Sequence, residues 1–284
     1  MTSCAPVLEG PAALWVEVRK VAAFFRRDFL INWSYRLAFF SDWANMIMQV
    51  ALFYFLGRLI DAQRLPDVGG VRPSYVEFVV VGIAFASFLQ IGLNRVVTVV
   101  RNEQLIGTLE SLLMTPTSPV TLQLGSVAYD VVYVPIRMVL FFVLSSVILG
   151  ADFTFLGLFP VALILVVFIP LVWGLGMISA AGVVTFKRGF GVVGLGSLIL
   201  TATSSTYFPV EVLPSWLQAV ARYNPITIAL SASRKALLGG AGWSEILPSV
   251  AALVPMAALT LVAGIVAFRL ALLRERRRGT LGLY

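Results

Sequence analysis

"LGLFPVALILVVFIPLVWGLGMISAAGVV", residues 156–184, contains neither a charged residue nor a histidine. A helix needs roughly 20 apolar residues to cross a hydrocarbon core about 30 Å thick, so this stretch is long enough to span a membrane. Five other stretches share its apolar character, at about 40–60, 76–98, 125–149, 189–207 and 248–270. The sequence therefore predicts an all-α membrane protein with six transmembrane helices.

The composition of the whole chain agrees with this fold class. Of the 284 residues, 59% are hydrophobic and only 12% are charged, whereas about a quarter of the residues in a soluble domain are charged. So many apolar side chains cannot be buried in one core in water, and lipid is the solvent that accommodates them.

The residue types also restrict the chemistry. The chain has no histidine and a single cysteine, Cys4, which excludes histidine-based triads, HExxH metal sites and an intrachain disulfide. The net charge of +7 is interpreted as topology signals and contacts with anionic lipid, because basic residues flank the apolar stretches. We therefore expect membrane lipid and no nucleic acid as a partner, and no catalytic, cofactor or metal site in this chain.

The distribution of basic residues predicts the orientation, because such residues concentrate on the cytoplasmic side of a membrane. One side of the predicted membrane receives Arg19, Lys20, Arg26, Arg27 and Arg36 before the first span, Lys187 and Arg188 after the fourth, and Arg269, Arg274, Arg276, Arg277 and Arg278 at the end. We expect a multi-pass protein of the cell inner (cytoplasmic) membrane with both termini in the cytoplasm.

The N-terminal region divides into a tail, residues 1–12, and an amphipathic helix, residues 13–36. Apolar residues recur there at steps of three or four, with charged residues on the opposite side. This pattern predicts a helix lying along the cytoplasmic interface, with Phe25, Arg26 and Arg27 as its candidate interface residues. A helix packed on a cytosolic partner is the alternative, and the two do not exclude each other.

The segment 208–247 is too polar for a span and too apolar for a free loop. Pro209, Pro214 and Pro225 divide it into short pieces. It is predicted to form short re-entrant helices at the outer end, before the last span, which are tolerated at membrane depth when they are buried in protein.

A polar stretch between the second and third spans, "RNEQLIGTLESLLMTPTSP" at residues 101–119, raises the question of an active site. Glu103 and Glu110 lie two helical turns, or roughly 10 Å, apart, whereas a proton-sharing dyad needs direct contact and an acid/base pair about 5–9 Å. The leucine spacing and Pro116 instead predict a short amphipathic helix over residues 101–116. It is either a docking helix for a cytosolic partner or a helix lying in the headgroups.

These residues resemble a known family. "RNEQLIGTLESLLMTP" is similar to the cytoplasmic loop motif of the type-2 ABC transporter permeases, and "FPVEVLPSWLQAVARYNPIT" to their external segment before the last span. The resemblance covers essentially the whole chain, with residues 37–284 as the permease domain. It implies a half-transporter that pairs with a second permease copy, a homodimer being favoured over a heterodimer, and with two copies of a separate ATPase.

The resemblance also assigns roles within the loop. It implies that residues 101–116 form the coupling helix to the ATPase, through Arg101, Glu103, Gly107, Thr108, Glu110 and Pro116. A P-loop needs Gly immediately before Lys, but Lys20, Lys187 and Lys235 follow Arg19, Phe186 and Arg234. ATP and Mg are therefore expected on the partner subunit.

Two polar groups within the predicted spans leave alternatives open. Asp130 and Arg137 form either a gate or substrate-path element or, as favoured here, a structural pair bridging neighbouring helices; Arg95 is expected to snorkel. Around "TATSST" at residues 201–206, a possible outer path or plain helix packing involves Thr203, Ser204, Phe208 and Pro209.

The resemblance thus implies the permease subunit of an ATP-driven exporter for a hydrophobic or amphiphilic substrate, such as a drug, natural product or lipid. Export of a lipid-linked polysaccharide or glycolipid is the alternative. A membrane-embedded enzyme and a scaffold protein are less favoured, because the carboxylates are spread along separate stretches.

Overall fold

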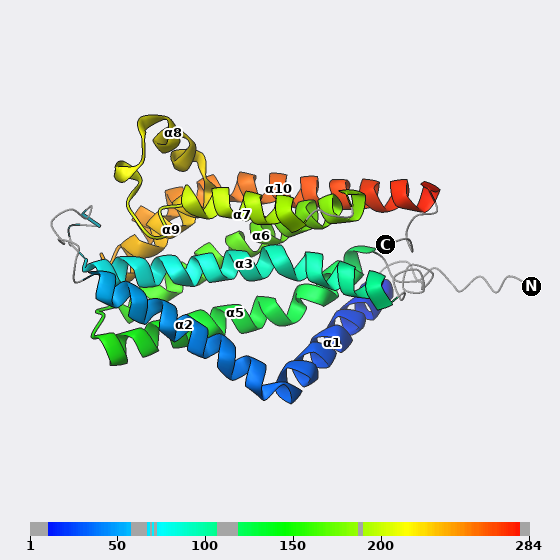
Figure 1. Ribbon diagram of the computed structural model, residues 1–284, viewed down its shortest axis with the longest axis horizontal. Helices are drawn as coiled ribbons and strands as arrows, with labels where there is room; N and C mark the ends of the chain where they lie inside the picture. The colour runs from blue at the N-terminus through cyan, green and yellow to red at the C-terminus, as the bar shows by residue number, and fades with distance from the viewer. Residues whose placement is uncertain are drawn as a thin grey trace, which may run out of the picture.

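The computed structural model describes residues 11–57, 67, 68, 70, 73–106, 119–186 and 190–278. The described elements are helices, as predicted (Figure 1). They are α1 (Pro11–Ser34), α2 (Arg36–Gly57), α3 (Tyr75–Ile106), α5 (Pro119–Leu149), α6 (Leu158–Phe186), α7 (Phe190–Ala202), α8 (Ser215–Tyr223), α9 (Pro225–Leu237) and α10 (Trp243–Arg278), with short 3₁₀ turns at Phe155–Gly157 and Val210–Val212.

Four of these helices have stretches long and apolar enough to cross a membrane. The stretches are Tyr75–Thr98, Val127–Leu149, Phe155–Thr185 and Trp243–Glu275. The apolar part of α2, Trp43–Gly57, is shorter, and α7 has 13 residues. An all-α, multi-pass membrane protein is therefore confirmed, while the count of six spans stays a prediction.

The centre of the bundle is the pair α6 and α10, with α3 on the other side of α6. Gly174 of α6 allows this close approach, because a Cβ atom there would overlap the carbonyl group of Thr260 on α10. Gly264 of α10 faces Gly174 in the same way. Small residues where helices cross are the usual means of packing helices in lipid, where apolar side chains gain little by leaving the solvent.

The N-terminal helix lies where the amphipathic pattern predicts a helix. α1 ends at Ser34, and after Tyr35 the chain enters α2 at an angle, so that the two helices form a V beside α5 (Figure 1). Of the predicted tail, residues 1–10 lie outside the described part of the chain. The start of α1 and the end of α10 lie at the same end of the bundle (Figure 1).

The helix α3 is longer than predicted. Residues 101–106 continue α3 rather than beginning a separate helix, because neither proline nor glycine interrupts the chain between Thr98 and Ile106. At 1.5 Å per residue the 32-residue helix is about 48 Å long, so it extends well beyond its apolar stretch. Gly107, Thr108, Glu110 and Pro116 lie outside the described residues.

The segment before α10 contains the two short helices that its prolines predict. Pro214 is the N-cap of α8, and Pro225 occupies the first turn of α9, where the missing N–H would have no helical partner. Asn224 separates the two helices and caps α9 by accepting a hydrogen bond from the Ile226 N–H. Their re-entrant position in a membrane stays a prediction.

Candidate functional site: polar contacts at the two ends of α3

Three helices are joined by one arginine at the end of the bundle where α1 begins and α10 ends. We call this end the inner end and the opposite one the outer end, after the predicted orientation. Arg95 of α3 donates from Nη2 to Asp28 Oδ2 of α1 at 2.8 Å, and its Nε lies 2.8 Å from Asp130 Oδ2 of α5. Arg27 Nε donates to the other oxygen of Asp28 at 2.9 Å. Asp28 is only 4% exposed, so its charge depends on these two guanidinium groups. We call Asp28, Arg95 and Asp130 the ion triad.

The triad gives Arg95 and Asp130 defined partners. Arg95, which is expected to snorkel, has a side chain that is 29% exposed and that pairs with carboxylates from two neighbouring helices. Asp130 joins α5 to α3 through Arg95, and its assignment as a structural residue stays a prediction. Arg137 is buried on α5. A gate role for Asp130 or Arg137 stays a prediction.

The packing of α1 on α5 brings Asp28 and Asp130 to the two sides of Arg95. Gly125 of α5 leaves room for the ring of Phe24, which a Cβ atom at residue 125 would overlap. Phe25, a predicted interface residue, packs on Tyr129 with ring centroids 6.0 Å apart. The guanidinium group of Arg27 lies 4.9 Å from the centre of the Phe24 ring, while Arg26 is exposed. The helix α1 is thus fixed to the bundle by ring packing and by charge together.

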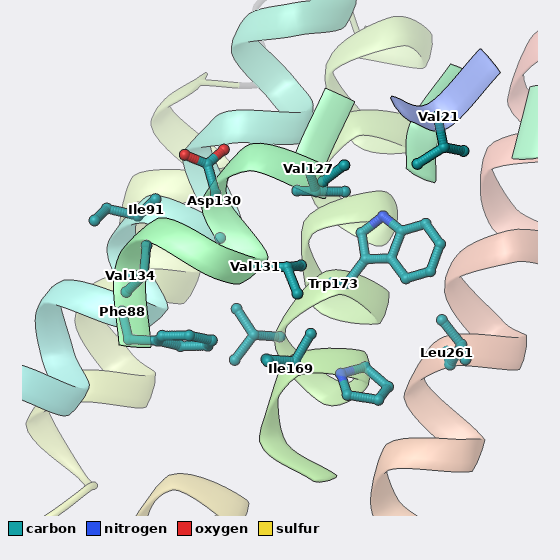
Figure 2. Close-up of a pocket in the computed structure, with 14 residues that line it drawn as sticks. Val21, Phe88, Ile91, Val127, Asp130, Val131, Val134, Ile169, Trp173 and Leu261 are labelled. Atoms are coloured by element: carbon teal, nitrogen blue, oxygen red, sulfur yellow. The ribbon is translucent and has the colours of Figure 1, made fainter. Parts of the chain in front are cut away.

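A cavity of about 450 Å³ lies beside the triad (Figure 2). Its walls come from α1, α3, α5, α6 and α10, and among the described residues they are almost entirely apolar. Asp130 borders the cavity, but its carboxylate points away from Val131, Ile169 and Trp173 (Figure 2), toward Arg95. The cavity therefore suits an apolar group, while the Asp130 carboxylate pairs with Arg95 in the ion triad.

A second polar cluster lies at the outer end of α3, around Arg234 of α9. Arg234 is 3% exposed and donates to the Phe78 carbonyl from Nε and Nη2, at 3.1 and 2.9 Å. Its other acceptors are the Thr206 carbonyl at 3.1 Å and Ser205 Oγ at 3.3 Å. The guanidinium carbon also lies 3.4 Å from the centre of the Phe78 ring. Backbone dipoles and a ring face thus stabilise this buried cation.

Close backbone contact completes the outer cluster. Gly82 of α3 lies against the Thr206 carbonyl, which a Cβ atom at residue 82 would overlap. Ser205, in the same turn, has a φ of 61°, a left-handed conformation that is uncommon for a residue other than glycine. The turn after α7 is therefore held tightly between α3 and α9.

Several hydroxyl groups of "TATSST" form hydrogen bonds or close contacts inside the subunit. Thr203 Oγ1 donates to the Ile199 carbonyl at 2.8 Å and accepts from Asn224 Nδ2 at 2.9 Å. Ser204 Oγ donates to the Thr201 carbonyl at 2.7 Å and contacts the Thr206 hydroxyl. This geometry favours the packing alternative for Thr203 and Ser204. Pro209 is buried and Phe208 is exposed, and a substrate path at these positions stays a prediction.

Asn224 allows a test of the outer cluster. Its side chain caps α9 and also donates to the Leu200 carbonyl at 2.9 Å. We expect Asn224→Ala to lower the free energy of unfolding by about 1–2 kcal/mol, the usual effect of losing an N-cap residue. Thermal unfolding in detergent measures this change. Asn224→Asp should lose less stability, because it keeps the cap acceptor; equal losses in the two variants would show that capping is not the cause.

The prediction from sequence identified Asp130 but not its partners. Asp28 lies within the predicted amphipathic helix, residues 13–36, and is 67 residues away from Arg95 in the chain. The available signal was an arginine near the inner end of a span that required a counter-charge. For the outer cluster, the sequence pattern gave no signal that Arg234 is buried against Phe78.

Comparisons with known proteins agree with the arrangement of the chain. The family model described as "ABC-2 type transporter" matches residues 19–238. A curated relative, the linearmycin resistance permease protein LnrN of Bacillus subtilis (strain 168), is 32% identical over 115 residues. That alignment covers 39% of this chain and 29% of the relative's length.

Proposed function

Since the chain belongs to the ABC-2 type transporter family, we propose that it is the membrane subunit of an ATP-driven exporter. It would move a hydrophobic or amphiphilic compound across the cell inner (cytoplasmic) membrane, with both termini in the cytoplasm. A separate ATPase in two copies would bind ATP and Mg, and a second permease copy, forming a homodimer, would complete the path. The family match over residues 19–238 carries this proposal.

The contacts of α3 support a way of transmitting movement. Near its inner end Arg95 ties α3 to α1 and α5; near its outer end Phe78 and Gly82 contact Arg234 and the turn after α7. Phe78 and Arg95 are about 26 Å apart along a continuous helix. A displacement of residues 101–116 by the ATPase would therefore move the two polar clusters together.

The name of the Bacillus subtilis relative supports a drug or natural product as the exported compound. The Bacillus subtilis relative is a resistance permease for linearmycin, which favours a drug or natural product over a lipid-linked polysaccharide as the compound exported here. The cavity beside the triad supports the same choice, because it has a volume of about 450 Å³ and its described walls are almost entirely apolar. Such a site suits an apolar moiety rather than a sugar chain.

Glu110→Ala tests the coupling role of residues 101–116. In proteoliposomes that contain the chain with its ATPase, we expect substrate-dependent transport to fall about tenfold, a typical coupling effect, while the complex still forms. Glu211→Ala is the matched control, because Glu211 is an exposed carboxylate in the segment before α8. Equal transport by the two variants would remove Glu110 from the coupling site, and a chain that binds no ATPase would overturn the proposed function itself.

A further inference from the structure

A second cavity, also of about 450 Å³, lies in the angle between α1 and α2 and is closed by α5. We call it the aromatic cleft. Its described lining consists of five aromatic side chains together with one amide and one guanidinium group: Phe29, Trp33, Phe40, Tyr129 and Tyr133, with Asn32 and Arg36. The cleft is separate from the cavity in Figure 2, whose lining shares none of these residues.

The rings form extended flat walls. Phe29 and Trp33 are stacked with centroids 6.1 Å apart, and Tyr129 and Tyr133 with centroids 5.3 Å apart. Trp33 is 64% exposed and Phe40 66% exposed. Aromatic side chains with polar atoms gather where a membrane protein meets the headgroup region.

The position of the cleft along the helices also agrees with the level of the headgroup region. Tyr129 and Tyr133 belong to the first two turns of the apolar stretch Val127–Leu149, and Arg36 and Phe40 precede the apolar stretch Trp43–Gly57. The cleft therefore lies where polar helix ends give way to apolar ones.

Among the described lining residues of the cleft, the charged one is Arg36. The guanidinium group of Arg36 lies 5.6 Å from the centre of the Trp33 ring, and none of the described lining residues is acidic. Asp28, the nearest acidic residue on α1, is buried against Arg27 and Arg95. Basic pockets between helices at the membrane surface bind anionic headgroups, and a guanidinium group matches a phosphate in geometry.

We propose that the aromatic cleft binds an anionic phospholipid from the adjacent leaflet. Arg36 holds the phosphate, and the aromatic rings contact the glycerol and the first part of the acyl chains. Since this lipid occupies the angle between α1 and α2, it fixes the interface helix relative to the first membrane helix. The proposal does not depend on the exported compound. It can therefore fail while the proposed function stands, and the proposed function can fail while this lipid site stands.

Photolabelling of the full chain tests this site. The chain is reconstituted in phosphatidylcholine nanodiscs that contain a trace of photoactivatable phosphatidylglycerol or photoactivatable phosphatidylcholine, and labelled peptides are mapped by mass spectrometry. We expect the phosphatidylglycerol probe to label residues 29–40 and 129–133 more than the phosphatidylcholine probe does. Arg36→Gln should lower this labelling about fivefold, the effect expected from one basic residue that contacts an anionic headgroup.

Two further variants control for charge and for folding. Arg222→Gln removes an exposed arginine from α8 and should leave the labelling unchanged, while Arg36→Lys should keep most of it; size-exclusion profiles identify any variant that is misfolded. Equal labelling by the two probes, or full labelling of well-folded Arg36→Gln, would overturn the proposal. Displacement of the probe by an exported compound and not by excess phosphatidylglycerol would also overturn it, by assigning the cleft to the substrate.

Discussion

Arg95→Met should lower the free energy of unfolding by about 3 kcal/mol, the largest effect that we expect from a single change. It removes the cation that serves both Asp28 and Asp130, and breaking a buried ion pair on one side leaves an uncompensated charge. Asp28 would keep only Arg27, which is itself largely exposed. Thermal unfolding in detergent, followed by tryptophan fluorescence, measures the loss.

A rescue variant separates the charge effect from a loss of packing. Combining Arg95→Met with Asp28→Asn and Asp130→Asn removes all three charges, so most of the stability should return. Arg269→Met, an exposed arginine near the inner end of α10, is the matched control and should change little. If Arg95→Met unfolded at the same temperature as the parent, the ion triad would contribute nothing to stability.

Gly174→Ala has the second largest expected effect, a loss of about 2 kcal/mol. The added methyl group would overlap the backbone of Thr260 and Leu261. A backbone, unlike a side chain, cannot relieve such an overlap by changing rotamer. The helices α6 and α10 would have to separate along the central contact of the bundle, and overpacking of this kind costs up to about 3 kcal/mol. Thermal unfolding and the monodisperse fraction after purification report the change.

Gly182 provides the matched control on the same helix. A Cβ atom at Gly182 meets no atom within 4 Å, so Gly182→Ala should keep its stability or gain up to about 1 kcal/mol from helix propensity. The same loss in both variants would mean that the glycines matter through helix flexibility and not through the α6–α10 contact.

Local rules predicted the elements of this fold well. Apolar length identified the four long spans, amphipathic spacing identified α1 within about two residues at each end, and prolines marked the start of α8 and α9. Residues 101–106 were predicted to begin a separate helix because the chain changes there from apolar to polar residues. Such a change does not interrupt the backbone, and residues 99–106 contain neither glycine nor proline, so residues 101–106 continue α3.

The candidate site was harder to predict, because its contacts join distant parts of the chain. Arg95 and Asp28 are 67 residues apart in the sequence, and Arg234 and Phe78 are 156 residues apart. Helical spacing relates residues three, four or seven apart, and it suggested Asp130 with Arg137 on one helix face. Helical spacing contains no information on which helices become neighbours, so it could not predict the pairing of Arg95 with Asp28 and Asp130.

The acceptors around Arg234 also separate two stages in completing the fold. The Phe78 carbonyl and the turn at Ser205 and Thr206 precede Arg234 in the chain, and their hydrogen-bond donor is the guanidinium group of that later residue. These hydrogen bonds can therefore form only after α9 has been synthesised.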